Sequence, residues 1–410
     1  MARTPLERLV DTLPLDLAAR AHEAGVAELL GGGDVSVYFA MAAAELLRTA
    51  VLPVRVPTMP LRTSPRPEIG SIEADTKAFG RISLDDFLAR PDSYAQGFVV
   101  AHRGAVVYES FPRMRPEDHH LWMSDAKPTT SLVIDLLIDE GKLADGDRVT
   151  SHLPVLAGTA WDQVSVKDVL DMTPGLDTEE NGETRADPDS LATRLFLAEF
   201  GFPYRGRVEG LVEVLRDAEA VAEPGRTFDY SSANPEVLVL LAEAIEQKRW
   251  VEIFDERVWS KIGAEAPLQV HTTPDGIAAA HGFISSTLRD HLRFGMLYTP
   301  SWGAVATEPI VTAAMVDRIR SGVRGRDFYR AGFDGPVFTS RLGDDEVIGN
   351  SRMWDGVWSD GDFWKSGLMA QGIYVSPDRD LVIAFYSLNL PDDSLHRYLR
   401  PLATSGLFDR

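Results

Sequence analysis

Two pairs of strand-like segments lie on either side of a long helical stretch in this 410-residue chain, and they restrict the fold more than any other feature. In the first pair, the apolar runs at residues 98–102 and 105–108 flank an Arg-Gly dipeptide, which predicts a β-hairpin. In the second pair, residues 372–375 and 381–387 flank a four-residue turn. We therefore predict an α+β fold in which an antiparallel sheet flanked by helices is built from both ends of the chain and interrupted by a mainly helical insertion.

The helical segments are predicted from the spacing of apolar residues. This spacing predicts helices over residues 128–143 and 235–246, and a further helix within 278–298. Residues 1–65 also have a helical pattern, broken by three consecutive glycines at 31–33. We expect an N-terminal helical extension at 1–65 and a main domain at 66–410, whose sheet part takes residues 66–165 and 285–410 and whose helical part takes 166–284.

The composition excludes several classes of function. The chain has no cysteine, which excludes disulfides, thiol nucleophiles and cysteine-ligated metal sites. Its net charge of −21 argues against nucleic acid and against anionic lipid as partners. The first thirty residues contain several acidic side chains, which a secretory leader would lack. The apolar stretch 35–52 contains Glu45 and Arg48, so we interpret it as a packed helix and not as a membrane span. We expect a cytoplasmic globular protein with no nucleic-acid or membrane partner.

A candidate nucleophile lies where a predicted helix begins. Ser124 and Lys127 are three residues apart, so they face the same side of the first helical turn. A helix N-terminus stabilises negative charge on a serine oxygen, and a lysine with a lowered pKa can accept the serine proton. The alternative, a helix-capping serine beside a solvated lysine, stays open for this motif alone.

Two later motifs favour the catalytic interpretation. Tyr230 and Ser232 form a Tyr-x-Ser motif directly before an amphipathic helix. Lys365, Ser366 and Gly367 form a third motif just before the last strand pair. Ser-x-x-Lys, Tyr-x-Ser and Lys-Ser-Gly follow one another at separations of roughly a hundred residues, an order that is difficult to obtain by chance.

With these motifs the chain resembles the serine β-lactamase-like superfamily, which includes penicillin-binding proteins, class C β-lactamases and family VIII carboxylesterases. Within it, the sequence is most similar to the 6-aminohexanoate-dimer (nylon-oligomer) hydrolase branch. Further matching blocks lie at residues 169–175, 287–290, 293–295 and 373–377. The resemblance covers about residues 95–410 and implies that the main domain is the catalytic one.

The resemblance implies a role for each motif residue. Ser124 would be the acylated nucleophile, Lys127 its proton acceptor and Tyr230 the proton shuttle. The backbone N–H groups of Ser124 and Leu368 would form the oxyanion hole. No metal and no cofactor would be required. The residues expected to line the substrate site are Ser232, Lys365, Ser366, Gly367, Trp364, Asp177 and Glu180.

Some of these assignments have structural alternatives. The nylon-hydrolase branch usually lacks a lysine at position 365, so Lys365 favours a substrate that carries a carboxylate. Asp177 and Glu180 lie in an acidic loop, which in that branch helps to bind the amino end of the substrate, and a solvated loop is the alternative. Trp364 could wall the pocket or pack in the core.

Two features bear on the chemistry of these motif residues. Neighbouring positive charges favour a neutral lysine and an ionised phenol, so we expect Lys127, Tyr230 and Lys365 to lower one another's pKa. Pro128 disfavours helical geometry at Lys127 but is tolerated in a first helical turn.

These observations predict a serine hydrolase that cleaves a small-molecule amide or ester through a covalent acyl-serine intermediate. The alternatives are β-lactamase or D-peptidase activity, acyl transfer from the same acyl-enzyme, and a catalytically silent relative that only binds an acyl ligand. For residues 1–65 two roles stay open, capping the sheet and mediating contacts in a homodimer.

Overall fold

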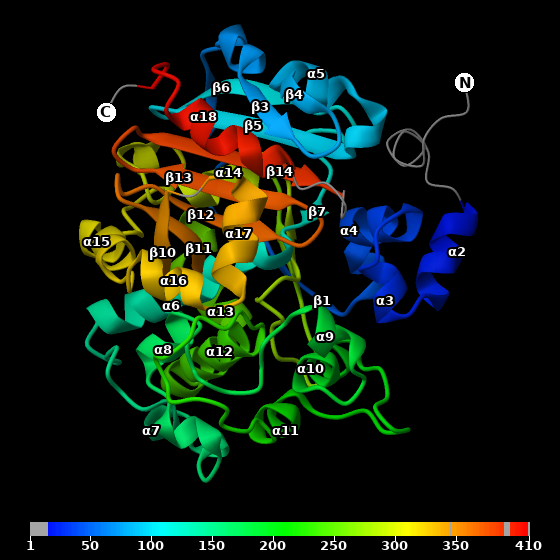
Figure 1. The fold of residues 1–410 in the computed structure, drawn as a ribbon, viewed down its shortest axis with the longest axis vertical. Helices are drawn as coiled ribbons and strands as arrows, with labels where there is room; N and C mark the ends of the chain where they lie inside the picture. Colours follow the sequence, from blue (N-terminus) through cyan, green and yellow to red (C-terminus); the bar gives the residue numbers. More distant parts are fainter. Residues whose placement is uncertain (1–14, 345, 389–393, 409–410) are drawn as a thin grey trace.

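The computed structural model describes residues 15–344, 346–388 and 394–408. Figure 1 shows a sheet region, built from early (cyan) and late (orange to red) parts of the chain, above a helical region from the middle of the chain (green). The N-terminal helices (dark blue) lie at the side of the molecule, where these two regions meet. Among the described residues, no helix is both long and apolar enough to cross a membrane.

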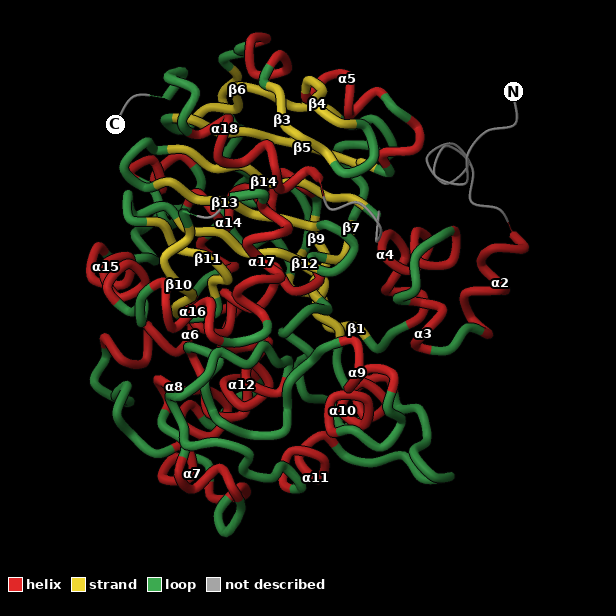
Figure 2. Tube along the Cα trace, viewed as in Figure 1, coloured by secondary structure: helices red, strands yellow, loops and turns green. Residues whose placement is uncertain are grey.

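The main sheet joins early and late strands of the chain, as predicted (Figure 2). Within the described residues it has eight strands in the order β10-β11-β12-β13-β14-β5-β6-β2, antiparallel except for β2 beside β6. Both predicted hairpins are confirmed, and β14 pairs with β5, placing Ile383 opposite Val100. The strands are β2 Arg62–Thr63, β5 Ala95–His102, β6 Ala105–Ser110, β10 Val347–Ser351, β11 Trp354–Trp358, β12 Phe363–Gly367, β13 Gln371–Ser376 and β14 Leu381–Ser387.

The centre of this sheet is buried on both faces, which explains its continuous apolar runs. Every residue of β5 and of β14 is buried. Helix α14 (Leu288–Met296) packs against both strands, and the rings of Phe98 and Phe385 stack across them. Arg103 and Gly104 both have positive φ, as a two-residue turn between twisted strands requires.

The predicted helices are confirmed, with small changes at their ends. Helix α6 takes Lys127–Asp139 and packs against α12, Ala233–Glu246. The helix expected within 278–298 is α14, and strand β9 (Ile284–Ser286) precedes it in the same stretch. The other helices of the middle region are α7 Val149–His152, α8 Val166–Leu170, α9 Gly182–Ala186, α10 Leu191–Phe200, α11 Leu211–Arg216 and α13 Trp250–Arg257.

The N-terminal segment contributes strands as well as helices. Its helices are α2 Leu15–Glu23, α3 Val26–Leu29 and α4 Asp34–Leu46. The stretch 35–52, interpreted as one helix, divides at Leu46, because β1 (Thr49–Leu52) pairs with β8 (Leu268–His271). In a second sheet, β8 continues to β9 and β7 (His120–Leu121), so the N-terminal segment extends the sheet beside the candidate nucleophile. The rest of the described chain forms β3 Glu73–Thr76, β4 Gly80–Ser83, α5 Leu84–Ala89, α15 Ala313–Ser321, α16 Arg326–Ala331, α17 Asp334–Leu342 and α18 Leu399–Ala403.

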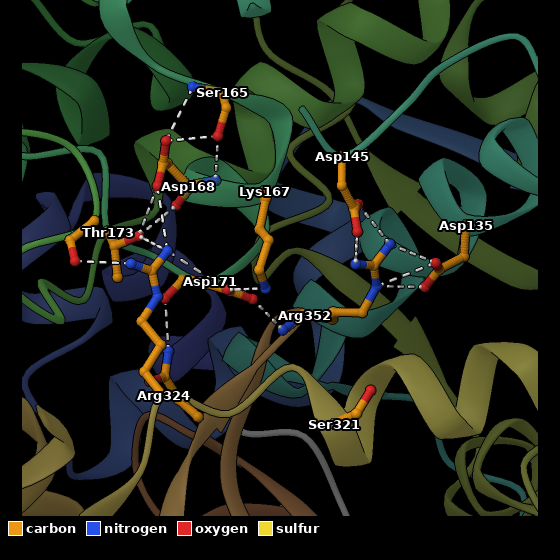
Figure 3. A network of polar contacts seen from close by, with 12 residues as sticks. Asp135, Asp145, Ser165, Lys167, Asp168, Asp171, Thr173, Ser321, Arg324 and Arg352 are labelled. Atoms are coloured by element: carbon orange, nitrogen blue, oxygen red, sulfur yellow. Dashed lines mark hydrogen bonds and ion pairs between the residues drawn. The ribbon is translucent and has the colours of Figure 1, made fainter. Parts of the chain in front are cut away.

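A buried ion-pair network ties the helical region to the sheet (Figure 3). Arg352, in the turn between β10 and β11, binds Asp135 of α6 at 2.6 Å and Asp145 at 3.0 Å. Its backbone N–H donates to Asp171, which follows α8. Because Asp135 lies on the helix that begins at Lys127, the network holds that helix in place relative to the sheet.

Candidate active site

Ser124 lies in a short 3₁₀ helix, Met123–Ala126, which leads directly into α6 at Lys127. Met123 has a φ of 50°, a left-handed conformation that is strained for a side chain of its kind and that occurs often at functional sites. Lys127 has helical angles although Pro128 follows it, since the proline falls in the first turn. Pro128 therefore does not disturb the Ser124–Lys127 spacing.

The Lys127 amine bridges the three segments that form the centre of the site. Its Nζ lies 3.0 Å from Ser124 Oγ, 3.0 Å from Ser232 Oγ and 3.1 Å from the carbonyl oxygen of His281. The side chain is fully buried, and burial, helped by the charge of Lys365, lowers the pKa of Lys127 to about 7 although nearby carboxylates oppose the shift. This position and this pKa are those that a general base for Ser124 would need.

Tyr230 lies between the two lysines, but it is not ionised. Its hydroxyl accepts a hydrogen bond from Lys365 Nζ at 3.0 Å, and the Lys127 and Lys365 amines lie 5.0 and 4.8 Å from its ring centroid. Burial and the charge of Asp355 raise the pKa of Tyr230 well above its usual value, and a hydrogen bond with Ser124 only partly opposes this. The expectation that Tyr230 is ionised was therefore wrong, because burial raises its pKa more than the two positive neighbours lower it. A neutral phenol can donate a proton.

Asp355, which the sequence analysis missed, is the partner of Lys365. Lys365 Nζ lies 2.7 and 2.8 Å from the two carboxylate oxygens, and both side chains are buried. Asp355 also accepts hydrogen bonds from the N–H and the hydroxyl of Ser366, and Arg341 donates to the same hydroxyl at 2.7 Å. A single carboxylate inside the apolar strand 354–358 was the available signal. Since Asp355 balances the charge of Lys365, that lysine no longer argues for a carboxylate-bearing substrate.

The strand that carries Lys365 ends against the turn that carries Ser124. A Cβ atom on Gly367 would lie 2.8 Å from the carbonyl oxygen of Trp122, so this close approach requires glycine. Met369 and Ala370 then take positive φ values and turn the chain into β13. The backbone of Leu368 is thereby held beside the Ser124 turn, in keeping with the predicted pair of oxyanion-stabilising N–H groups.

The N-terminal helices support both of these turns. Phe39, on α4, belongs to a buried apolar cluster that also contains Met123, from the nucleophile turn, and Met369, from the turn after β12. Leu368 packs against the same cluster. The N-terminal segment thus contacts the two turns from which the oxyanion hole is expected to form.

The structure separates the two predicted residues of the acidic loop. Glu180 is buried, and its carboxylate accepts hydrogen bonds from the Ser232 N–H at 2.5 Å and from Arg185 at 3.0 Å. Burial opposes its ionisation, but Arg185, Lys127 and the Ser232 hydrogen bond lower the pKa of Glu180 to about 2. Asp177 is exposed and accepts a hydrogen bond from the backbone of Glu219. Glu180 therefore lies within the catalytic cluster, and Asp177 is placed apart from it.

Trp364, predicted as a pocket residue, is a core residue. Its side chain is fully buried, its indole N–H donates to His396 at 3.1 Å, and its ring packs edge-on against Phe338. The physical reason is strand alternation. Neighbouring side chains of a strand point to opposite faces of the sheet, and Lys365 points to the face on which Tyr230 lies.

Known proteins are similar to this chain in sequence and in fold. The Beta-lactamase family model matches residues 92–407, a range that contains every residue of the cluster. The 6-aminohexanoate-dimer hydrolase of Paenarthrobacter ureafaciens is 27% identical over 362 residues, which cover 86% of this chain and 85% of that protein.

Solved structures agree on the fold. A Bacillus anthracis protein provisionally named 6-aminohexanoate-dimer hydrolase matches with a TM-score of 0.74 and 20% identity, covering 90% of this chain and 92% of the other. EstCE1, described as a hydrolase with promiscuous acyltransferase activity, matches with a TM-score of 0.54 and 18% identity over 75% of this chain and 93% of its own. The extent of the family match shows that the chain belongs to the Beta-lactamase family of serine hydrolases.

Proposed function

We propose that this protein hydrolyses small linear amides, and esters of similar shape, through an acyl-enzyme on Ser124, with 6-aminohexanoate dimers as the model substrate class. One observation carries the proposal. Lys127 Nζ joins Ser124 and Ser232 by hydrogen bonds of 3.0 Å in a buried setting that holds its pKa near 7. A serine hydroxyl is a weak nucleophile, and a neutral amine at this distance supplies the base that it needs.

Acylation would move one proton through the cluster. Lys127 takes the hydroxyl proton of Ser124 while Oγ attacks the substrate carbonyl, and the N–H groups of Ser124 and Leu368 stabilise the resulting oxyanion. The neutral phenol of Tyr230 gives its proton to the departing nitrogen or oxygen, and Lys365 stabilises the negative charge that remains. At the acyl-enzyme stage Lys127 then carries the extra proton and Tyr230 is a phenolate beside Lys365, so no net proton is gained or lost.

Deacylation would follow the same path in reverse. A water molecule replaces the leaving group and gives one proton to the Tyr230 phenolate while its oxygen attacks the acyl carbonyl. Lys127 then returns its proton to Ser124 Oγ as the acyl–Ser124 bond breaks, which releases the carboxylic acid and restores the starting protonation states. Glu180 supports both steps by holding the Ser232 backbone, and Ser232 in turn binds Lys127.

The substrate class rests on similarity and on one feature of the site. The Paenarthrobacter ureafaciens relative matches over most of both chains, and its name specifies a dimer of an amino acid, which contains no β-lactam ring. In this chain Lys365 is bound to Asp355, so the third motif does not present an unbalanced cation for the carboxylate of a β-lactam. Both points favour a linear amide over a β-lactam.

The test compares the wild type with Ser124→Ala on three substrates: the 6-aminohexanoate linear dimer, a p-nitrophenyl ester and a β-lactam. We expect the wild type to release 6-aminohexanoate and p-nitrophenol, and the variant to release neither above background. Ser131→Ala, which changes a buried serine further along α6, is the matched control and should retain activity. Ester turnover that is equal in wild type and Ser124→Ala would refute the nucleophile. Turnover of the β-lactam alone would refute the substrate class.

A further inference from the structure

Three buried side chains converge beside the catalytic lysine, and the proposed reaction uses none of them. They are Glu199 on α10, Glu236 on α12, and His281 in the loop before β9. Each offers one ligand atom, and these atoms all lie within 4.8 Å of one another. The exposed fractions of the three residues are 5%, 0% and 3%.

Most of the ligand atoms of this cluster lack a hydrogen-bond partner. Within the described part of the chain, the Glu199 carboxylate and His281 Nε2 have none, and the Glu236 carboxylate has none beyond a contact with the His281 backbone that lowers its pKa. His281 Nε2 lies 3.0 Å from Glu199 Oε2, but the contact does not have the geometry of a hydrogen bond. Buried charged groups are normally paired or bound to a metal, because leaving them without a partner is strongly unfavourable.

Lys127 does not supply the missing partner. The three hydrogens that its ammonium form carries on Nζ are matched by three acceptors: Ser124 Oγ, Ser232 Oγ and the carbonyl oxygen of His281. The cluster is therefore next to Lys127, and its own ligand atoms lie within 4.8 Å of one another.

The set of donors fits a divalent transition-metal ion. Imidazole nitrogens and carboxylate oxygens are both zinc ligands, with metal–ligand distances of roughly 2.0–2.2 Å. In a tetrahedral site with those metal–ligand distances, two ligand atoms lie about 3.4 Å apart. The distance of 3.0 Å between His281 Nε2 and Glu199 Oε2 is close to this value. The other ligand atoms, which lie within 4.8 Å of one another, reach it with a small side-chain shift. Two carboxylates also balance the charge of a dication, which leaves a neutral buried site.

We propose that Glu199, Glu236 and His281 bind one divalent metal ion, with Zn²⁺ as the best match to the ligands. The ion joins α10, α12 and the loop before β9, three elements that come together beside Lys127. It also fixes the backbone of His281, whose carbonyl oxygen binds the Lys127 amine. Its role is structural, and it does not depend on which bond Ser124 attacks.

The first test measures the metal content of the full chain. The protein is produced without an affinity tag in zinc-supplemented medium, and inductively coupled plasma mass spectrometry then counts the metal. We expect about one zinc per chain, and an X-ray absorption spectrum that reports one imidazole among oxygen ligands. Less than about one zinc in ten chains, both after growth and after refolding in zinc, would overturn the proposal and indicate that water or protons fill the cluster.

The second test uses variants. Glu236→Gln and His281→Asn should each lower the zinc content at least fivefold, whereas Glu209→Gln, a buried glutamate paired with Arg194, should retain it. Protein refolded with zinc should melt at a higher temperature than protein refolded with a chelator, and the difference should vanish in Glu236→Gln. Equal zinc content in all variants would contradict the assigned ligands. Because Ser124→Ala should bind zinc normally, failure of this proposal and failure of the proposed function are distinguishable.

Discussion

The two halves of the catalytic cluster hold their lysines in different ways. Lys127, on the helical side, donates hydrogen bonds to two hydroxyls and a carbonyl oxygen, and all three of these acceptors are uncharged. Lys365, on the sheet side, forms a two-oxygen ion pair with Asp355. Both lysines are fully buried, and burial lowers the pKa of both.

The difference shows how one cluster can contain a base and a fixed positive charge. For Lys127 burial lowers the pKa to about 7, so a large fraction of the amine is neutral at physiological pH. For Lys365 burial also lowers the pKa, but the adjacent Asp355 carboxylate opposes this shift and favours the charged form. Tyr230 lies between them, and its hydroxyl is oriented by the charged lysine. The following predictions test this division of roles, ordered from the largest expected effect on catalysis to the smallest.

Replacing Lys127 with methionine removes the base and should cause the largest loss. We expect kcat/KM for a p-nitrophenyl ester to fall by about 10³-fold, within the range typical of general bases. Lys248→Met, at an exposed lysine, is the control and should be indistinguishable from wild type. If Lys127→Met retained more than about a tenth of the activity, another residue would be the base.

Asp355→Asn should remove the ion pair that distinguishes Lys365 from Lys127. The substitution leaves the Lys365 charge buried without its carboxylate, a change that commonly costs about 3–5 kcal/mol of stability. We expect a lower melting temperature and a kcat reduced by about 10²-fold per folded molecule, because Lys365 loses the carboxylate that holds its amine beside Tyr230. Asp327→Asn, at an exposed aspartate of α16, provides the comparison. An unchanged kcat would show that the ion pair has no catalytic role.

The activity of the wild type should follow the ionisation of Lys127. The base works only when neutral, so kcat/KM should decrease as pH falls below about 7, by about tenfold for each unit, and level off above pH 8. The profile is measured by ester turnover between pH 5 and 9, with a stability check at each pH. Activity that stayed constant from pH 5.5 to 8 would exclude Lys127 as a base with this pKa.

Glu180→Gln should move that profile without abolishing activity. The Glu180 carboxylate raises the pKa of Lys127, so its removal should shift the acidic limb of the profile to lower pH. At pH 8 we expect less than about a tenfold change, since the glutamine can still accept the Ser232 hydrogen bond. Glu183→Gln, three residues along and exposed, should leave the limb in place. A shift to higher pH would contradict the sign of this interaction.

Phe39→Ala tests the N-terminal segment and should affect catalysis least. Phe39 is fully buried, and its ring packs against Phe200 and Phe283, so its loss should cost about 3–5 kcal/mol of stability. The buried apolar cluster around Phe39 also contains Met123 and Met369, which lie in the two turns of the site. We expect a lower melting temperature with only a few-fold change in kcat. A loss as large as that of Lys127→Met would mean that α4 belongs to the catalytic site itself.

Much of the fold was predictable because its signals are local. The hairpin around Arg103 needs only two apolar runs and a turn dipeptide, and the three motifs carry Ser124, Lys127, Tyr230 and Lys365 in a fixed order. The end of α4 at Leu46 was not predictable, because strand β1 forms only by pairing with β8, more than two hundred residues away.

The remaining parts of the site depend on contacts that a sequence pattern does not contain. Asp355 meets Lys365 only through the register of β11 and β12, which aligns Gly356 with Trp364. The Lys127 acceptor at His281 is a backbone carbonyl, which leaves no trace in side-chain identity. The ionisation of Tyr230 was predicted with the wrong sign because the degree of burial decided it.

The most direct test of the account is the rate at which a fluorophosphonate labels the protein, measured against pH and mapped by peptide mass spectrometry. This reaction reports the activation of the nucleophile alone, without deacylation or product release. The account predicts a single adduct on Ser124 whose rate of formation rises with pH, with a midpoint near 7, and is nearly abolished in Lys127→Met. An adduct at another residue, or a Ser124 rate that does not change between pH 5.5 and 8, would contradict it.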